Sequence, residues 1–464
     1  MDATNVTAPC KHCVHDTHTL THSVHLGHTL VSIIIYLLTH SLTHTCLHRS
    51  AVTNPEQRKV HITVTDTSPC TTHTHTHTHT HTHTHTTPKT FSVDNILHEY
   101  STQAETYHTC GASIVDSILQ GYDGTIFSYG ETKSGKTFSI NGLQDYWINV
   151  TTRNSKCTVS NSNDEEELYG IIPRTGKHLF DSIHVAERRS NEALVFEVNV
   201  SFLQVYNERV YDLLRLEKYM TPQVKLREKP YTGVYVEGLT YMPVTCYDSF
   251  LTALRTGSRH LAIQTTHMGQ CTARAHSIFT VELMCTTVST GMKRTSRLQL
   301  IDMAGSESVP MVQGSSQLKE GQCISKSLNN LGSIINALVT PGVKFVPYRN
   351  SVLTRLMREA LGGRARCVML ATVRATAVAF DETVSTLLFA SKVQMIKNYP
   401  VVQQFDAPDV SIRDDAVLDK SVDNVKDLKS PEGNSTYLTD APSASISSRT
   451  NPDQFDELDH KKVD

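Results

Sequence analysis

The feature that most constrains this chain is a G-x-x-x-x-G-K-T loop at residues 130–137, which directly follows an apolar run at residues 125–129. Glycines at both ends of such a loop let the backbone bend tightly, so that successive N–H groups converge on an anion. The lysine then reaches the β- and γ-phosphates of a polyphosphate, and the threonine hydroxyl is a ligand for Mg²⁺. We therefore predict a phosphate-binding loop that opens a helix and is made by Gly130, Glu131, Thr132, Lys133, Ser134, Gly135, Lys136 and Thr137. The alternative is a glycine-rich strand-to-helix turn that binds nothing.

The composition of the 464 residues limits the function. A formal net charge of −3 gives no overall polycationic character, so nucleic acid is not indicated as a partner. The eleven cysteines are scattered, which is typical of reduced cytosolic thiols. Cys10 and Cys13 with two nearby histidines could hold zinc, but no second ligand pair follows them at zinc-finger spacing. The apolar run at residues 30–38 is about half as long as a membrane-spanning helix, so we expect no membrane span.

Composition divides the chain into three segments. Residues 73–86 alternate His and Thr, and the same two residues recur loosely around them. Such a tract could capture metal ions, but a CA dinucleotide repeat also encodes it, so translated simple-repeat DNA is the simpler interpretation. We expect residues 1–88 to lack a fold. Residues 89–400 alternate β-rich runs with helical patterns, which predicts a layered α/β domain. Residues 401–464 are rich in Asp, Ser and Pro, so we expect a disordered tail without a coiled coil for dimerisation.

A second sequence motif has the residues that a phosphate loop needs beside it in a nucleotide site. The run L-I-D-M-A-G-S-E at residues 300–307 has an apolar strand pattern that ends in an acidic residue and a glycine. Asp302 can hold the shell of a Mg²⁺ ion, as the aspartate of a P-loop NTPase does. Gly305 lets its N–H approach the γ-phosphate closely. The alternative is an ordinary buried strand that ends in a turn.

Five motifs in order resemble the kinesin motor domain. They are the phosphate loop, the D-M-A-G-S-E sequence, and the segments at residues 206–214, 346–355 and 382–392. The resemblance covers about residues 89–400. It implies a P-loop NTPase fold of the α/β class, with helices on both faces of a mixed central sheet. It also implies ATP and Mg²⁺ as cofactors, microtubule-stimulated ATP hydrolysis, tubulin as the partner, and a place on the cytoskeleton in the cytoplasm.

The resemblance also assigns residues to roles. Residues 268–280 are similar to the family's first switch, whose arginine is Arg274, and it implies that Arg274 pairs with Glu307 around the attacking water. The implied catalytic residues are Arg274, Glu307, Gly305 and Lys136, and the implied metal ligands are Thr137 and Asp302, the latter through water. The implied microtubule contacts are Lys326 in a helix at 315–339, Tyr348, Arg349 and Arg355, with a further patch at Lys225, Arg227 and Lys229.

The chain departs from the family's pattern in three places. The first switch has Gly269, Thr272, Ala273 and Ala275 where the family has Asn and hydroxyl residues. In the phosphate loop, Glu131 and Lys133 replace Gln and Gly, which adds charge to the loop. The first strand with its R-x-R-P adenine contact is missing, because the His/Thr segment occupies its place. These departures favour nucleotide binding over fast turnover, and the alternative function is a degenerate relative that binds microtubules or nucleotide without productive hydrolysis.

Two further expectations concern other families and the end of the domain. A small GTPase or a transporter ATPase would need an N-K-x-D motif or an ABC signature, and the sequence has neither. Residues 396–402 favour a linker that docks as a strand on the domain.

Overall fold

The computed structural model describes residues 29–30, 32–38, 47–50, 60–64, 89–143, 166–189, 193–215, 222–229, 233–267, 275–307, 315–374 and 379–405. Contacts divide the chain after Ala407, and all the described residues lie in the first unit, Met1–Ala407. The tail predicted at residues 401–464 falls mostly outside the described residues, as do the His/Thr repeat at 73–86 and the zinc candidates Cys10 and Cys13.

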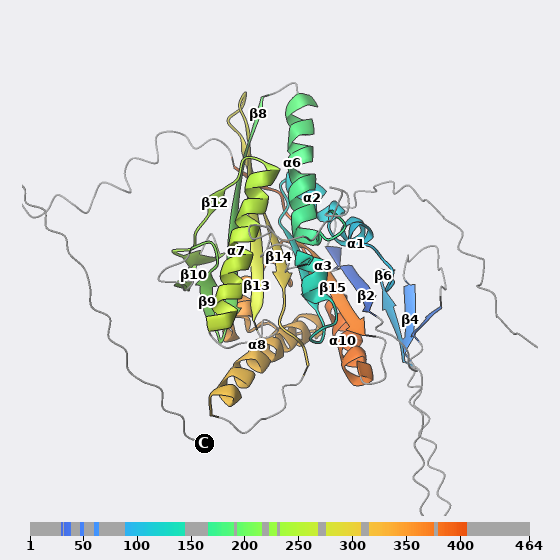
Figure 1. The fold of residues 1–464 in the computed structure, drawn as a ribbon. Helices are drawn as coiled ribbons and strands as arrows, with labels where there is room; N and C mark the ends of the chain where they lie inside the picture. Colours follow the sequence, from blue (N-terminus) through green and yellow to red (C-terminus); the bar gives the residue numbers. More distant parts are fainter. Residues whose placement is uncertain are drawn as a thin grey trace, which may run out of the picture. The chain divides into compact units, whose positions relative to one another are not determined.

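A mixed β-sheet is the centre of this unit (Figure 1). Its strands are parallel to their neighbours from β14 to β6 and antiparallel from β11 to β14. In spatial order they are β11 (Gly233–Glu237), β10 (Gln223–Lys229), β9 (Arg209–Asp212), β8 (Leu194–Tyr206), β13 (His276–Thr287), β14 (Lys293–Asp302), β7 (Gly124–Tyr129), β15 (Arg366–Arg374), β2 (Ser32–Leu38) and β6 (Asn95–Leu97). The long strands at the centre are rich in buried aliphatic and aromatic residues, as strands covered on both faces require.

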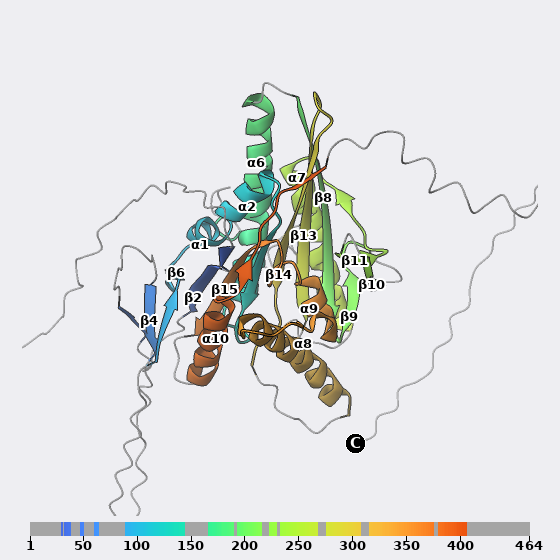
Figure 2. The ribbon, with the colours of Figure 1, turned by 180° about the vertical axis from the view of Figure 1, so that it is seen from behind.

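Helices cover both faces of the sheet (Figures 1 and 2). Residues of one set pack with the first face in one buried cluster: α1 (Gln103–Cys110), α2 (Ala112–Leu119), α3 (Lys136–Asn141), α6 (Ile171–Arg189) and α7 (Tyr247–His267). Residues of the other set pack with the second face: α8 (Ser315–Val339), α9 (Val352–Leu356) and α10 (Phe380–Val393). The predicted α/β class with helices on both faces is therefore confirmed.

The buried apolar residues of α8 form a stripe along one side of the helix. Leu331 and Ile335 on α8 are buried in the core of the second face, and Leu338 packs against the same core. Residues spaced by three and four positions share one side of a helix, so this stripe fixes which side of α8 meets the sheet. The opposite side, which carries Lys326 and Asn329, is exposed.

The expectation that nothing folds before residue 88 is wrong at β2. This strand lies in parallel between β15 and β6, with Ile34 only 3 % exposed. A strand buried on both faces needs a continuous apolar run, and the segment S-I-I-I-Y-L-L supplies one. The apolar run at residues 30–38 therefore contributes a strand to the central sheet.

Shorter strands complete the unit. β1 (Thr29–Leu30) pairs with β16 (Lys397–Asn398), and β3 (Leu47–Ser50), β4 (Val60–Val64) and β5 (Lys89–Val93) form a separate sheet. β12 (Met242–Pro243) pairs with β8, and a 3₁₀ turn, η2, covers Tyr348–Asn350.

The linker expected at residues 396–402 leads into a docked strand that begins just beyond it, so the expectation of a disordered tail is wrong at residues 403–405. β17 (Gln403–Phe405) runs antiparallel to β14. Just before it, Val402 forms a bridge with Tyr122, and the Gln403 N–H donates to the Gly121 carbonyl at 3.0 Å. The strand is therefore anchored beside the start of β7, the strand that leads into the phosphate loop.

Candidate functional site

The phosphate loop joins the end of β7 to the start of α3. Both glycines have positive φ, 153° at Gly130 and 101° at Gly135. A Cβ on Gly130 would clash with the carbonyl of Thr372 on β15, so this position requires glycine. The Ser134 hydroxyl lies 2.7 Å from the Glu131 carbonyl and 2.6 Å from the Thr372 hydroxyl. The loop is therefore held against β15 by its own side chains.

Lys136 is the buried cation of the loop. Its side chain is 6 % exposed, and Nζ donates to the carbonyls of Gly130 at 2.9 Å and Glu131 at 2.7 Å. Burial lowers the pKa of Lys136, while the carboxylates of Asp302, Glu307 and Glu131 act in the opposite direction. The ammonium is thus fixed inside the loop, where the sequence placed a phosphate contact.

Lys133, the other loop lysine, has a different role. Its backbone lies in the left-handed region at φ 65°, and its side chain is exposed. Glycine adopts this conformation freely, whereas a residue with a Cβ is strained by about 1 kcal/mol. Lys133 therefore strains the turn, and its exposed side chain does not fill the loop.

The metal candidates lie side by side, Thr137 in the first turn of α3 and Asp302 at the end of β14. The Thr137 hydroxyl donates to Oδ2 of Asp302 at 2.6 Å, and the Ser128 hydroxyl donates to Oδ1 at 3.1 Å. Burial raises the pKa of Asp302, while the Thr137 hydrogen bond and the Lys136 charge lower it. A hydroxyl beside a carboxylate is an oxygen donor set of the kind that Mg²⁺ prefers. The residues present therefore fit the ion that the sequence predicted.

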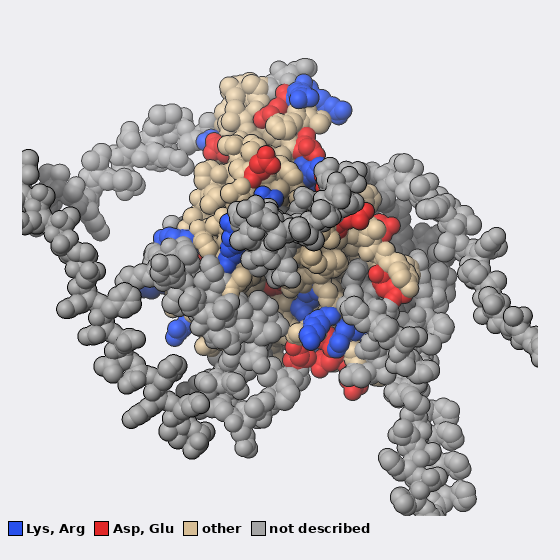
Figure 3. All heavy atoms as spheres, in the orientation of Figure 1, with Lys and Arg blue, Asp and Glu red and all other residues tan. Residues whose placement is uncertain are grey.

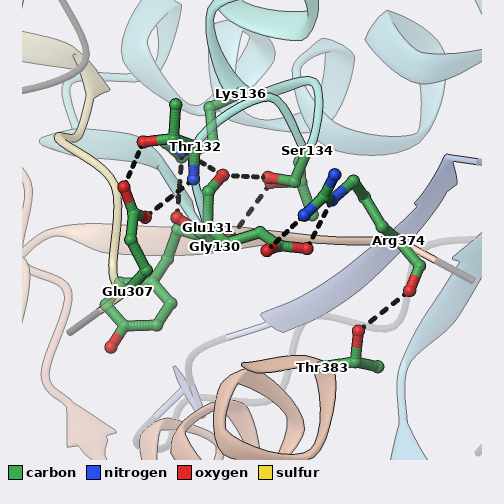
Figure 4. Close-up of polar contacts among 10 residues, drawn as sticks. Gly130, Glu131, Thr132, Ser134, Lys136, Glu307, Arg374 and Thr383 are labelled. Atoms are coloured by element: carbon green, nitrogen blue, oxygen red, sulfur yellow. Dashed lines mark hydrogen bonds and ion pairs between the residues drawn. The ribbon is translucent and has the colours of Figure 1, made fainter. Parts of the chain in front are cut away.

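Glu307 lies directly on the phosphate loop (Figure 4), and Gly305 lies against Thr132 of the same loop. Glu307 accepts from the Thr132 N–H at 2.8 Å and also binds the Thr132 hydroxyl. The Ser306 N–H donates to the Gly130 carbonyl at 2.9 Å. A Cβ on Gly305 would clash with Thr132 and Glu307, so only glycine lets this turn approach the loop. The predicted partner of Glu307, Arg274, lies outside the described residues, so that pairing stays a prediction.

His276 connects this turn to α8, and the sequence reasoning did not single it out. Its Nδ1 accepts from the Ala304 N–H at 3.0 Å, and its Nε2 lies 3.0 Å from the Ser327 hydroxyl. Since Nδ1 is an acceptor, the ring proton belongs on Nε2, where it donates to Ser327. Burial, and then the Lys136 charge, lowers the pKa of His276 to about 4. The signal was present, because the first-switch pattern ends in this histidine.

Arg374 is a second residue that the sequence reasoning missed. It ends β15 and binds both carboxylate oxygens of Glu131, with Nε 2.6 Å from Oε1 and NH2 2.7 Å from Oε2 (Figure 4). The charge that Glu131 brings into the loop is therefore neutralised. The two residues are 243 positions apart, so no local pattern connects them.

The predicted microtubule contacts divide into exposed and half-buried residues. Lys326 on α8 is exposed, and the Arg349 side chain on η2 is 79 % exposed while it pairs with Glu228 at 3.0 Å. Tyr348 is half-buried, and its hydroxyl donates to the Leu361 carbonyl at 2.5 Å. Arg355 is also half-buried and lines a cavity beside the sheet. The first two are thus better placed than the last two to meet a partner.

Of the further basic patch, Lys225 is exposed, and Arg227 pairs with Glu237 at 3.0 Å. The side chain of Lys229 lies outside the described residues. On the face seen in Figure 3, basic and acidic side chains of the described residues are interspersed. Contact with an acidic partner would therefore depend on individual exposed cations and not on a large positive field.

The buried lysine in a glycine-bounded loop, the adjacent hydroxyl and carboxylate, and the mixed sheet together define a P-loop nucleoside triphosphatase fold. The family model "Kinesin motor domain" matches residues 48–396. The chain belongs to the kinesin motor domain family. The match begins ahead of residue 89, where the sequence motifs placed the start of the domain.

Known proteins agree with this assignment. The chain is 34 % identical over 342 residues to Kinesin-related protein 3 of Dictyostelium discoideum, which covers 73 % of this chain but 26 % of that protein. This chain thus spans about a quarter of the length of that relative. The structure of a fast kinesin matches with a TM-score of 0.65 and 27 % identity, covering 86 % of this chain and 98 % of that one. A KIF14 dimer with AMP-PNP in complex with a microtubule matches with a TM-score of 0.64 and 31 % identity, covering 81 % and 96 %.

Proposed function

We propose that this protein is an ATP-dependent microtubule motor that binds and hydrolyses Mg-ATP and couples hydrolysis to microtubule binding and movement. The observation that carries the proposal is the contact of Thr137 with Asp302 beside the buried Lys136. This arrangement supplies the cation, hydroxyl and carboxylate that phosphoryl transfer requires at one place. The KIF14 structure with AMP-PNP and a microtubule supports the same nucleotide and partner.

Each residue of the site has a part in the proposed reaction. The loop N–H groups and Lys136 bind the phosphates, and Thr137 and Asp302 would hold Mg²⁺, which neutralises charge on the β- and γ-phosphates when bound. Gly305 brings its N–H toward the γ-phosphate, and Glu307 closes the turn on the loop. Arg274 is proposed to join Glu307 around the attacking water. His276 is hydrogen-bonded to Ala304 at one ring nitrogen and to Ser327 of α8 at the other, so a movement of Ala304 is transmitted to α8.

A second candidate function is a degenerate relative that binds nucleotide or microtubules without productive hydrolysis. The observation that favours it is the loss of hydroxyl groups at Ala273 and Ala275. A lost hydrogen bond to a charged group costs about 1.5–3 kcal/mol, which is about tenfold to a hundredfold in rate.

Phosphate release from the full chain, measured with and without microtubules, separates the two functions. We expect microtubules to raise the rate at least about tenfold, because closing the site around the phosphates requires α8 and its neighbouring turn to move together. A chain that binds a fluorescent ATP analogue with Mg²⁺, yet shows the same slow release in both conditions, would support the degenerate relative. A chain that binds no analogue would contradict both.

The proposal places the protein on microtubules in the cytoplasm, with tubulin as its partner. Among the described residues, no helix combines the length and the apolar character needed to cross a membrane. The absence of a coiled coil for dimerisation stays a prediction, which rests on the sequence of the tail alone.

Replacement of Arg349 by alanine is expected to weaken co-sedimentation with microtubules about threefold at low salt, and less as salt rises. The Arg349 side chain is 79 % exposed, so acidic tubulin can compete with Glu228 for its charge. The matched control is Arg188→Ala, which removes an exposed arginine from α6 on the opposite face of the sheet. Equal loss in both variants would mean that net charge matters and that Arg349 makes no specific contact.

A further inference from the structure

The ion pair between Glu131 and Arg374 is absent from the roles that the family resemblance assigns. Glu131 is the second residue of the phosphate loop and is 7 % exposed. The Arg374 guanidinium meets it in a fork that uses two nitrogens and both carboxylate oxygens. This bidentate geometry fixes the carboxylate in orientation as well as in position. The hydrogen bond that Arg374 donates to Glu131 raises the pKa of Arg374, so the arginine stays charged.

Arg374 is itself held at its backbone. Its carbonyl accepts from the Thr383 hydroxyl at 3.0 Å, and Thr383 lies in the first turn of α10 (Figure 4). Thr383 is 3 % exposed, and β15 continues the central sheet up to Arg374. The guanidinium therefore extends from a backbone that is hydrogen-bonded to α10 and paired with β2 at Leu38.

The backbone carbonyl of Glu131 binds Lys136. The Glu131 carbonyl accepts from Lys136 Nζ at 2.7 Å and from the Ser134 hydroxyl at 2.7 Å. Since the side chain of Glu131 is fixed by Arg374, its peptide group cannot turn freely. A continuous line of contacts thus runs from Arg374 through Glu131 to the Lys136 ammonium (Figure 4).

We propose that Arg374 is a positioning residue of the nucleotide site, which acts through Glu131 to hold Lys136 and to cancel a negative charge beside the phosphates. The inference rests on the proposed function, because it concerns the same site. It also accounts for a glutamate in this loop: without Arg374 a buried carboxylate would repel a triphosphate and would lack its partner. The pair therefore functions as a unit, and Glu131 is tolerated only with Arg374.

The test compares R374M, E131Q and the double variant E131Q/R374M in the full chain. With R374M we expect at least about tenfold weaker binding of a fluorescent ATP analogue with Mg²⁺, because Glu131 is left charged and unpaired. E131Q/R374M should recover affinity to within about threefold of the natural chain, since the charge and its partner are removed together. The control is R366M, which removes an arginine from the opposite end of β15 and should leave affinity unchanged.

A second measurement does not need nucleotide. Lysine acylation followed by mass spectrometry compares the buried Lys136 with the exposed Lys133 in the same loop. In the natural chain Lys136 should react much more slowly than Lys133, and in R374M its rate should rise toward that of Lys133 while R366M leaves it unchanged. Unchanged Lys136 reactivity in folded R374M overturns the positioning role, even if the chain binds no nucleotide. Failure of the natural chain to bind the analogue contradicts the proposed function alone.

If the pair only stabilises the fold, R374M would lower the melting temperature more than the double variant does, with affinity and Lys136 reactivity unchanged. That result would also overturn the proposal. Recovery in the double variant together with a faster-reacting Lys136 in R374M supports it.

Discussion

Replacing Lys136 by alanine is expected to abolish ATP turnover and to weaken binding of Mg-ATP at least about a hundredfold. Lys136 faces the carboxylates of Asp302, Glu307 and Glu131 from inside the loop. Without its ammonium these acidic groups would lie beside a triphosphate with less charge to balance them, so both binding and transfer would suffer. The measurement is binding of a fluorescent ATP analogue and steady-state phosphate release by the purified chain.

The matched control is Lys133→Ala, which removes the same charge from the same loop. Lys133 is exposed, so screening by water should limit the change in affinity to about threefold. Both variants keep a Cβ at their positions, so backbone strain at residue 133 is unchanged by the control. Equal losses in the two variants would show that the loop only attracts anions, and normal turnover by K136A would contradict the assigned role of Lys136.

The parts of the site that follow one another along the chain could be predicted from the sequence. Gly130, Gly135 and Lys136 belong to one loop, and their spacing predicts where they lie because the backbone must bend at the two glycines. Asp302 and Gly305 end a strand that lies in parallel beside the strand before the loop, and parallel neighbours bring their carboxyl ends to one edge. The contact of Thr137 with Asp302 follows from that geometry.

Contacts between distant segments could not be read from the sequence. Arg374 meets Glu131 only because β15 lies next to β7, and a lone arginine after an apolar strand has no distinctive pattern. The strand β2 was missed for another reason. Its apolar run is short and surrounded by His and Thr, so composition hid a segment whose burial depends on two partner strands.

The stability of the fold is expected to fall as the pH is lowered from 7 to 5, with a contribution of about 2 kcal/mol from His276 alone. In the folded protein burial lowers the pKa of His276 from 6.5 to about 4. As the pH falls, His276 is therefore protonated below pH 6.5 in the unfolded chain but only below about pH 4 in the folded protein. Stability from this group is fully present above pH 6.5 and is lost progressively in that window, approaching about 3 kcal/mol in total.

Urea unfolding of the natural chain, H276Q and H184Q at pH 7 and pH 5 isolates the contribution of His276 to the free energy of unfolding. Burial raises the pKa of Asp302, which acts in the opposite direction, so the comparison of variants matters more than the absolute slope. H276Q should lose most of the difference between pH 7 and pH 5, whereas H184Q, which removes an exposed histidine from α6, should keep it.

The same protonation would break the acceptor role of Nδ1 toward the Ala304 N–H, since a charged imidazole has two donors and no acceptor. The hydrogen-bonded link from Ala304 through His276 to Ser327 on α8 would then be lost as the stability falls. An identical pH slope in H276Q and the natural chain would show that His276 does not titrate in this window. It would also remove the reason to regard the ring as a fixed neutral connector between Ala304 and Ser327.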